Sequence, residues 1–286
     1  MPRFNRFPHA IARLVATAAV IAFIVLASTR LSPAAELQKE TVQAWNRYVQ
    51  WAEQKVAREL SNPNVFLIQN TLPPKEKSEI WQSLNRGEIV TKRVPSVVPQ
   101  GISFEVPSGE IHHWWGTILL RNVTLERLLL FLQDYDHHAG KFSDVERSRL
   151  ISKNGDRYRF FFRLRRSKAF VTAYYNTEQE CLYAYYGSTR ASSQSEAVKI
   201  AEIEDPGTAS ERERQPGNDR GFLWRLVSWW RFEQKGADVI IELESASLSR
   251  NIPTAIKFMP GISGYIRSTP RESMESVLTS IRNSMK

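Results

Sequence analysis

The sequence has very little cysteine and lacks the short motifs that mark common catalytic and metal sites. Cys181 is the only thiol in 286 residues, so no disulfide can form within the chain. No HExxH, CxxC or facial-triad spacing is present, and there is neither a nucleophile elbow nor a glycine-rich phosphate loop. We therefore expect no metal and no cofactor. Cys181 lies in the strand-like run ECLYAYYG, where we expect a buried small hydrophobe.

A hydrophobic run long enough to span a bilayer comfortably is also missing near the N-terminus. The apolar segment LVATAAVIAFIVLA covers residues 14–27, whereas a spanning helix needs about 20 residues. Three arginines precede this segment and STRLSPAA follows it, which is the order of a secretory signal peptide. We predict a signal peptide over residues 1–35, cleaved after Ala34 or Ala35, with an uncleaved anchor as the alternative. No cysteine lies near the junction, which excludes a bacterial lipoprotein anchor.

The charge of the chain is modest once the leader is set aside. The whole sequence has 39 basic and 30 acidic residues, and the leader carries four of the arginines and no acid. The remaining 35 basic and 30 acidic residues are dispersed, without a long run of lysine or arginine. We therefore expect no nucleic-acid partner. The predicted location is the periplasm or the extracellular space, with no stable membrane span after cleavage.

Helical spacing appears before and after a long strand-rich region. Residues 37–60 repeat apolar side chains at helical intervals, and a second helix is predicted from Pro73 to Asn85. A third follows Thr124, with Leu125, Leu128, Leu129, Leu132 and Tyr135 at helical spacing. The last helix is expected to begin at Pro270, where Thr269 and Glu272 form a capping box. Its apolar stripe consists of Met274, Val277, Leu278, Ile281 and Met285.

Alternating side chains predict strands between about Ile89 and Arg250. In DRYRFFFRLRR one face holds Tyr158, Phe160, Phe162 and Leu164, and the other holds arginines. Around Lys235-Gly236 the same alternation predicts a hairpin that pairs Phe232 with Val239, Trp230 with Ile241, Ser228 with Leu243, Leu226 with Ser245 and Trp224 with Ser247. The opposite face, with Arg225, Arg231, Glu242 and Glu244, is expected to be solvated. On the inner face large residues oppose serines, which either line a space or face water at its mouth.

The order of these elements resembles a known superfamily. A strand, a helix, a long antiparallel meander and a C-terminal helix, together with the runs QDYDHHAGKFSDVERSRL and GFLWRLVSWWRF, resemble the START-like (SRPBCC) superfamily and an exported bacterial branch of it. That superfamily includes polyketide cyclases and the major birch pollen allergen. The resemblance covers about Ile111 to Met285 and implies an α+β helix-grip fold, in which a curved antiparallel sheet wraps the long C-terminal helix and leaves an apolar cavity.

This resemblance also suggests how the chain is divided. Residues 1–35 are the predicted signal peptide, residues 36–104 an N-terminal helical extension, and residues 105–286 the START-like helix-grip domain. The helical extension lies outside the common pattern of the superfamily.

The sequence contains two pairs of adjacent histidines, a residue type that often binds metals, but the expected geometry of each pair argues against a metal site. In IHHWWG the side chains of neighbouring strand residues point to opposite faces, so His113 and Trp115 share one side, and His112 and Trp114 share the other. The side chains of His137 and His138, at a helix end, also diverge. A site that took one histidine from each pair would lack any supporting motif. Packing is the expected role of these residues, and His113 is a weak candidate for a catalytic base.

Two classes of function remain. The first is an exported carrier or sensor for a hydrophobic small molecule or lipid, and the second is a cyclase- or dehydratase-like enzyme that uses an inward histidine or tyrosine in the same cavity. A third idea is an envelope protein whose N-terminal helices dock a partner. No convergent acid–base set is visible, which favours the carrier over the enzyme. The residues predicted to contact the ligand are Tyr158, Phe160, Phe162, Trp224, Trp230, Leu243, Ser245 and Ser247.

The leader leads to a direct test. N-terminal sequencing of the exported protein should begin at Ala35 or Glu36, because the basic start, short apolar segment and small residues specify cleavage there. Recovery of the intact leader in a membrane fraction would instead establish the uncleaved anchor.

Overall fold

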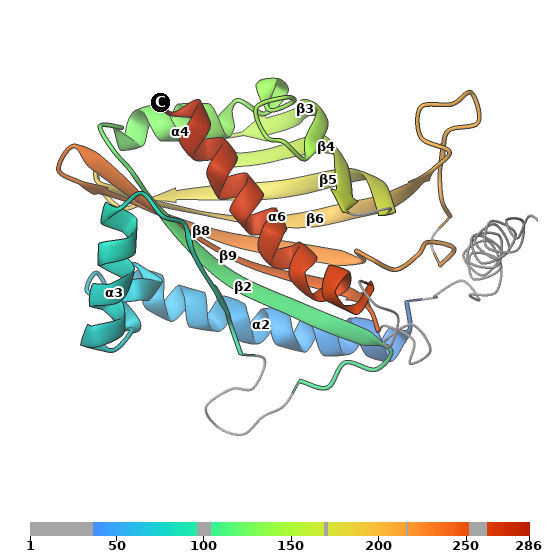
Figure 1. The fold of residues 1–286 in the computed structure, drawn as a ribbon, viewed down its shortest axis with the longest axis horizontal. Helices are drawn as coiled ribbons and strands as arrows, with labels where there is room; N and C mark the ends of the chain where they lie inside the picture. The colour runs from blue at the N-terminus through green and yellow to red at the C-terminus, as the bar shows by residue number, and fades with distance from the viewer. Residues whose placement is uncertain (1–36, 96–103, 169–170, 216, 252–261) are drawn as a thin grey trace, which may run out of the picture.

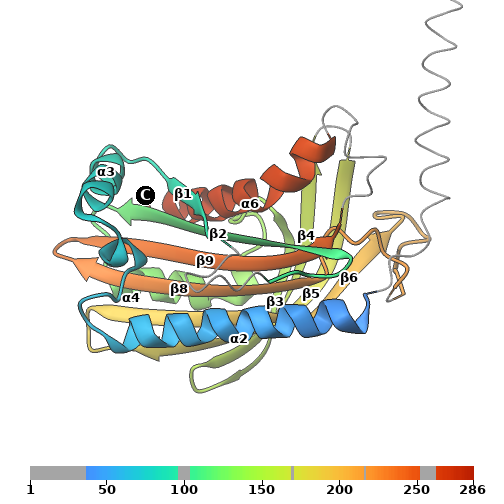
Figure 2. The same cartoon turned by 90° about the horizontal axis from the view of Figure 1, so that it is seen from below.

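The computed structural model describes residues 37–95, 104–168, 171–215, 217–251 and 262–286. The predicted signal peptide therefore lies outside the described residues. The described residues form one antiparallel sheet of nine strands with helices on both faces (Figures 1 and 2). This is the predicted α+β class, in a helix-grip arrangement.

Most neighbouring strands are also close in the sequence, as in a meander, whereas the pair β2–β9 joins strands that are far apart in the chain. Along the sheet the order is β1-β2-β9-β8-β6-β5-β4-β3, and the short β7 pairs with β6. The strand bounds are Val90–Arg93 (β1), Gly109–Leu120 (β2), Val145–Asn154 (β3), Arg157–Lys168 (β4), Val171–Tyr185 (β5), Arg190–Glu204 (β6), Arg212–Glu213 (β7), Arg225–Lys235 (β8) and Asp238–Arg250 (β9). β1 is the edge strand beside β2, so the segment before residue 104 contributes to the sheet as well as to the helices.

The helices divide between the two faces of the sheet. Their bounds are Lys39–Ser61 (α2), Ile68–Thr71 (η1), Pro74–Asn85 (α3), Leu125–Gln133 (α4), Tyr135–His137 (η2) and Ile262–Ser284 (α6). Figure 2 shows α6 on one face, here called the inner face, and α2 on the opposite, outer face. None of the described helices combines the length and apolarity needed to cross a membrane.

The predicted N-terminal helices are confirmed. α2 buries Trp45, Tyr48, Ala52 and Val56 on one side, as the helical spacing of apolar residues predicts, and it ends just before Asn62-Pro63. α3 ends before Gly87, whose φ of +78° suits glycine in the left-handed region after a helix.

The predicted start of the last helix is wrong. α6 begins at Ile262, and Pro270 lies inside it rather than at its first turn. Pro270 removes one main-chain hydrogen bond from the helix, and the chain continues through this position. Within the predicted apolar stripe Met274, Leu278, Ile281 and Met285 are buried and Val277 is partly buried. Gly116 of β2 allows this contact, because a Cβ there would lie 2.7 Å from the sulfur of Met274.

The predicted register of the β8–β9 hairpin is wrong by two residues. Phe232 pairs with Ile241, Trp230 with Leu243, Ser228 with Ser245 and Leu226 with Ser247. The turn is Gly236-Ala237, flanked by the pair Lys235 and Asp238, and Gly236 has a φ of +61°. A tight turn needs a positive φ at its first central residue, which glycine adopts without strain and lysine does not. A shift of two residues leaves every side chain on its predicted face.

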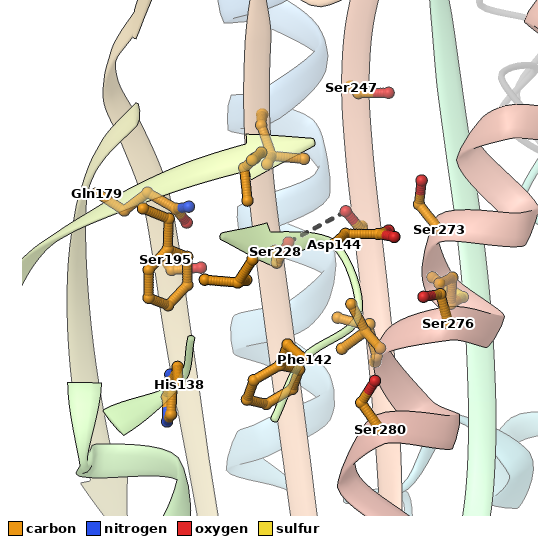
Figure 3. A pocket seen from close by; sticks show the side chains of 18 of the residues that line it. His138, Phe142, Asp144, Gln179, Ser195, Ser228, Ser247, Ser273, Ser276 and Ser280 are labelled. Carbon is orange, nitrogen blue, oxygen red and sulfur yellow. Dashed lines mark hydrogen bonds between the residues drawn. The ribbon is translucent and has the colours of Figure 1, made fainter. Parts of the chain in front are cut away.

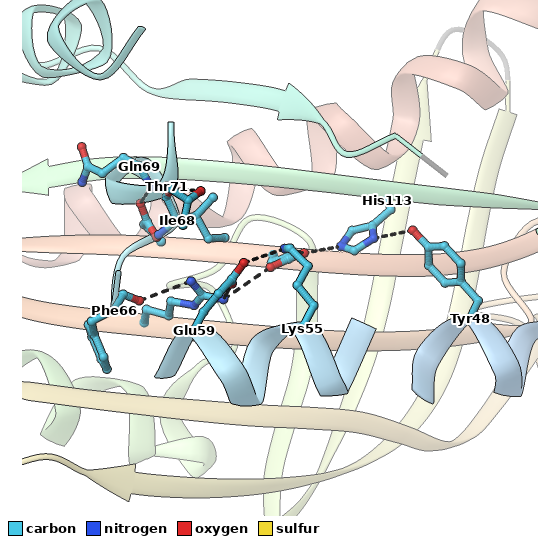
Figure 4. A network of polar contacts seen from close by, with 11 residues as sticks. Tyr48, Lys55, Glu59, Phe66, Ile68, Gln69, Thr71 and His113 are labelled. Atoms are coloured by element: carbon cyan, nitrogen blue, oxygen red, sulfur yellow. Dashed lines mark hydrogen bonds and ion pairs between the residues drawn. The ribbon is translucent and has the colours of Figure 1, made fainter. Parts of the chain in front are cut away.

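The outer face of this hairpin is buried rather than solvated, which corrects the sequence-based expectation. Arg231, Glu242 and Glu244 are at most 1% exposed because α2 and the segment that follows it cover them. The charges form a network with groups from that cover (Figure 4). The alternation within the hairpin shows which residues share a face. It cannot show that α2, which lies far earlier in the chain, covers that face.

Glu244 lies at the centre of the network. One of its carboxylate oxygens is 2.8 Å from Nζ of Lys55 and 3.0 Å from Nε2 of His113, and the other is 3.7 Å from Arg231. Nδ1 of His113 is 2.6 Å from the hydroxyl of Tyr48, with which it shares a hydrogen bond. Burial alone would raise the pKa of Glu244, but the contacts with His113 and Lys55 lower it to about 2. Glu244 is therefore a buried carboxylate held by cationic and hydrogen-bonding partners.

Arg231 and Glu242 attach the chain that follows α2. Arg231 donates to Glu59 at the end of α2 and, over 3.2 Å, to the carbonyl of Phe66. Glu242 accepts from the main-chain N–H groups of Ile68 and Gln69 at the start of η1. Burial raises the pKa of Glu242 to about 7 against the opposing effect of Arg231. These contacts fix η1 and the start of α3 on the sheet.

Removing the central carboxylate should destabilise the protein strongly. Glu244→Ala leaves His113 without a carboxylate and Lys55 with only the longer contact to Glu59, and breaking a buried pair in this way costs about 3–5 kcal/mol. Urea unfolding near neutral pH, followed by tryptophan fluorescence, measures the loss. The matched control is Glu178→Ala, which removes the partner of the partly exposed Arg159 and should cost less than about 1 kcal/mol.

The same variant has a signature in acid. The lowered pKa of Glu244 contributes stability that is present above the unfolded value of 4.5 and is lost as the pH falls towards 2. The difference between wild type and Glu244→Ala should therefore shrink over that range. A loss no larger than that of the control, or one constant with pH, would show that the network does not stabilise the fold.

Candidate ligand-binding cavity

A cavity of about 340 Å³ lies between α6 and the inner face of the sheet. Its walls come from β2, β4, β5, β6, β8 and β9 on one side and from α6 on the other, with the segment from Tyr135 to Val145 at one end. The volume lies at the small end of the range of ligand pockets, about 300–1,000 Å³.

Most of the residues predicted to bind the ligand lie on this cavity. Phe160 and Phe162 of β4, Trp230 of β8, and Leu243, Ser245 and Ser247 of β9 line it. Their alternation places them on the inner face, which is the face that α6 covers only in part. Their role in binding stays a prediction.

Two of the predicted residues lie elsewhere. Trp224 belongs to the apolar cluster beneath α2 on the outer face, and its indole donates to Asp219 over 3.0 Å. β8 begins only at Arg225, and Gly221 just before it has a φ of +71°, so the alternation of the strand does not extend back to Trp224. Tyr158 is on the inner face but packs into the core near α4, where its hydroxyl donates to Gln133 over 3.1 Å.

Serines form a row across the floor of the cavity. In the observed register Ser195 of β6 pairs with Ser228 of β8, and Ser228 pairs with Ser245 of β9. The row continues to Cys181 at one end and to Trp114 at the other. Cys181 is buried, as predicted. Ser228 donates to Ser245 over 3.0 Å, and all of these residues line the cavity. Small side chains on three neighbouring strands leave space there, and their hydroxyls make this part of the floor polar.

The helix adds a second group of hydroxyls. Ser273, Ser276 and Ser280 lie beside the apolar stripe of α6 and face the cavity in Figure 3. Two of these serines bond to Ser143. The hydroxyls of Ser143 and Ser276 are 2.6 Å apart, and the main-chain N–H of Ser143 donates to the hydroxyl of Ser280 over 3.3 Å. The sequence-based prediction missed these serines, although their spacing of three and four residues was a usable signal.

One charged pair lies on the cavity wall. Asp144 is 2.6 Å from Arg166 of β4. Burial raises the pKa of Asp144, against the opposing effect of Arg166. The wall is otherwise mostly apolar, and Trp114, Tyr175 and Phe142 add aromatic surface that the sequence did not single out.

The predicted alternation of the histidines and tryptophans of β2 is confirmed. His112 and Trp114 line the cavity, whereas His113 and Trp115 are buried on the outer face. His113 faces Tyr48 and Glu244 beneath α2, so the weak candidate for a catalytic base lies outside the cavity. His112 contacts Ser249 over 3.0 Å, and burial lowers its pKa. Within the described residues no three histidine, cysteine or acidic side chains come together as metal ligands.

No protein-family model and no curated protein matches the sequence. Among solved structures, a fragment of a STAR-related lipid transfer protein from Xanthomonas axonopodis is 14% identical, with a TM-score of 0.43, over 68% of this chain and 98% of that one. The Zhui aromatase/cyclase from Streptomyces sp. R1128 is 10% identical, with a TM-score of 0.39, over 62% and 94% of the two chains. The lipid transfer and protein localization domain of human StarD13 is 9% identical, with a TM-score of 0.39, over 75% and 98%.

Two of these structures are named for lipid transfer and one for aromatase/cyclase activity. With identities of 14% or lower and TM-scores below 0.5, they assign neither a ligand nor an activity to this chain.

Proposed function

We propose that this protein is exported and carries a hydrophobic small molecule or lipid in the cavity between α6 and the sheet. The observation that carries the proposal is the cavity itself, with its aromatic walls and its few grouped hydroxyls. Binding sites for small molecules are typically concave and mostly apolar, with a small number of placed polar groups.

The arrangement of the cavity floor favours a binding site over a packed hydrophobic core. Protein interiors are packed as densely as organic crystals, and the inner positions of a packed core are normally held by apolar side chains. Here Ser195, Ser228 and Ser245 occupy three neighbouring inner positions where leucine or valine would fill the space. Aromatic residues stand on either side of this row, so an apolar molecule would contact both rings and hydroxyls.

The leader predicted from the sequence supports the location. A basic start, a short apolar segment and a small-residue end direct export, and a lone buried cysteine is compatible with an oxidising compartment. In this setting the proposed role is a carrier or sensor of an apolar compound outside the cytoplasm.

Filling the floor of the cavity separates this proposal from a packed core. Ser245→Leu should leave the free energy of unfolding nearly unchanged or raise it, because the added side chain enters empty space, and it should weaken binding of an apolar probe. If the site were packed, the added volume would cost about 1–3 kcal/mol. Thermal unfolding gives the stability, and titration with the fluorescent probe N-phenyl-1-naphthylamine gives the binding.

The control is the same substitution at an exposed serine of the sheet. Ser152→Leu on β3 should change neither the binding nor the unfolding temperature appreciably. Strong destabilisation by Ser245→Leu, together with no probe binding to wild type, would mean a filled core and would end the carrier proposal.

A further inference from the structure

His138 lies at one end of the cavity, immediately after η2. The side chain is 3% exposed and contributes to the cavity lining. Figure 3 shows it with Phe142 and Ser280 at one end of the lining residues, and Ser247 at the other. Buried polar atoms normally have a hydrogen-bond partner, so a partner is expected for each of the two ring nitrogens of this histidine.

One nitrogen has a clear role. Nε2 is 3.0 Å from the main-chain carbonyl oxygen of Phe131, which can only accept a hydrogen bond. Nε2 therefore carries the proton and donates. Burial lowers the pKa of His138, against the opposing contact with that carbonyl, so the ring is neutral near neutral pH. In a neutral imidazole with a proton on Nε2, Nδ1 presents a lone pair and accepts.

That acceptor is buried and has no hydrogen-bond partner among the described residues. Around the ring are aromatic side chains, with centroids 4.9 Å away for Phe142, 5.3 Å for Tyr135 and 5.7 Å for both Phe131 and Phe162. Tyr135 is the only one of these four residues with a polar side-chain group, and its hydroxyl is already paired with that of Tyr183 over 3.1 Å. A buried acceptor without a donor is costly, so such positions are normally filled by water or by a ligand.

We propose that His138 Nδ1 accepts a hydrogen bond from the ligand, and that the ligand is a neutral apolar molecule bearing a hydroxyl group, an alcohol or a phenol. The inference rests on the carrier function proposed above and adds the chemical class of the cargo. The apolar body lies among the rings of β4 and β8, and the hydroxyl lies at the His138 end. A carboxylate does not fit this end, because it has no proton to donate and would lose its hydration against a lone pair and aromatic walls.

Matched naphthalene derivatives test the inference by displacing N-phenyl-1-naphthylamine from the wild-type protein near neutral pH. 2-Naphthol can donate, 2-methoxynaphthalene has the same ring but cannot donate, and 2-naphthoate is an anion. 2-Naphthol should displace the probe at a concentration about five- to tenfold lower than the ether, which is the range for one net hydrogen bond. 2-Naphthoate should be the weakest.

Two variants assign the preference to a residue. His138→Phe keeps an aromatic ring and removes the acceptor, so 2-naphthol and the ether should become equal while binding of the ether is retained. His112→Phe is the matched control, because His112 is the other histidine of the cavity and is already paired with Ser249. Its readout is the ratio between 2-naphthol and the ether, which should stay as in wild type whatever the change in affinity for both.

A measurement on the wild type covers the case in which His138→Phe does not fold. The ¹⁵N resonance of His138 Nδ1 should move when 2-naphthol is added and stay in place with the ether, since only the former donates to this nitrogen.

The outcomes separate this inference from the carrier function. Equal displacement by 2-naphthol and its ether, an unmoved Nδ1 resonance, or a preference that survives in His138→Phe would overturn the role of His138 and leave the carrier function standing. In that case a bound water satisfies Nδ1. Failure of wild type to bind the probe or any of the three compounds would overturn both.

Discussion

The buried carboxylate of Glu244 is the constraint on which the arrangement of the molecule depends. β9 places Glu242 and Glu244 on the outer face of the sheet, where they are almost completely shielded from water. The cover that shields these carboxylates must also supply their partners, because an uncompensated buried charge is very costly. Lys55 and Tyr48 of α2 and His113 of β2 meet that need, and Glu59 holds Arg231. The N-terminal helices are therefore a part of the sheet's structure and leave the inner face to α6.

The sequence predicts the faces of the strands well because alternation is local. His112 and His113, and likewise Leu243 and Glu244, separate to the two sides as the period of two requires. What covers each face is decided by residues far away in the chain, which no local pattern contains. For that reason the charged face of the β8–β9 hairpin suggested a solvated surface, whereas α2 buries it. The predicted start of α6 was wrong for a related reason. The local capping pattern at Thr269 is typical of a helix start, but the helix begins earlier, at Ile262.

A two-residue error in register had a larger consequence for the site than for the fold. It keeps each side chain on its face, so the inner residues of β8 and β9 are the same in both pairings. The pairing across the sheet differs, however. The predicted register opposed serines to large residues, whereas the observed register, set by the positive φ of Gly236, puts Ser228 beside Ser245. Together with Ser195 these residues make one polar row across a mostly apolar floor, which a list of inner residues alone does not reveal.

The polar groups on the two faces differ in their charge, and this difference favours the inner face as the one that binds. On the outer face the histidine is held between a tyrosine and a glutamate, and the carboxylates are met by cations or main-chain N–H groups. These contacts hold α2 and the chain that follows it against the sheet. On the inner face the polar groups are mostly neutral hydroxyls, and His138 donates from Nε2 while its buried Nδ1 has no hydrogen-bond partner among the described residues. Neutral groups are less costly to shield from water than charges, so the fold tolerates them without a partner. A ligand that forms a hydrogen bond with such a group then gains binding free energy. The outer face therefore contributes stability, and the inner face retains the unfilled volume and the unfilled hydrogen-bonding capacity that selective binding requires.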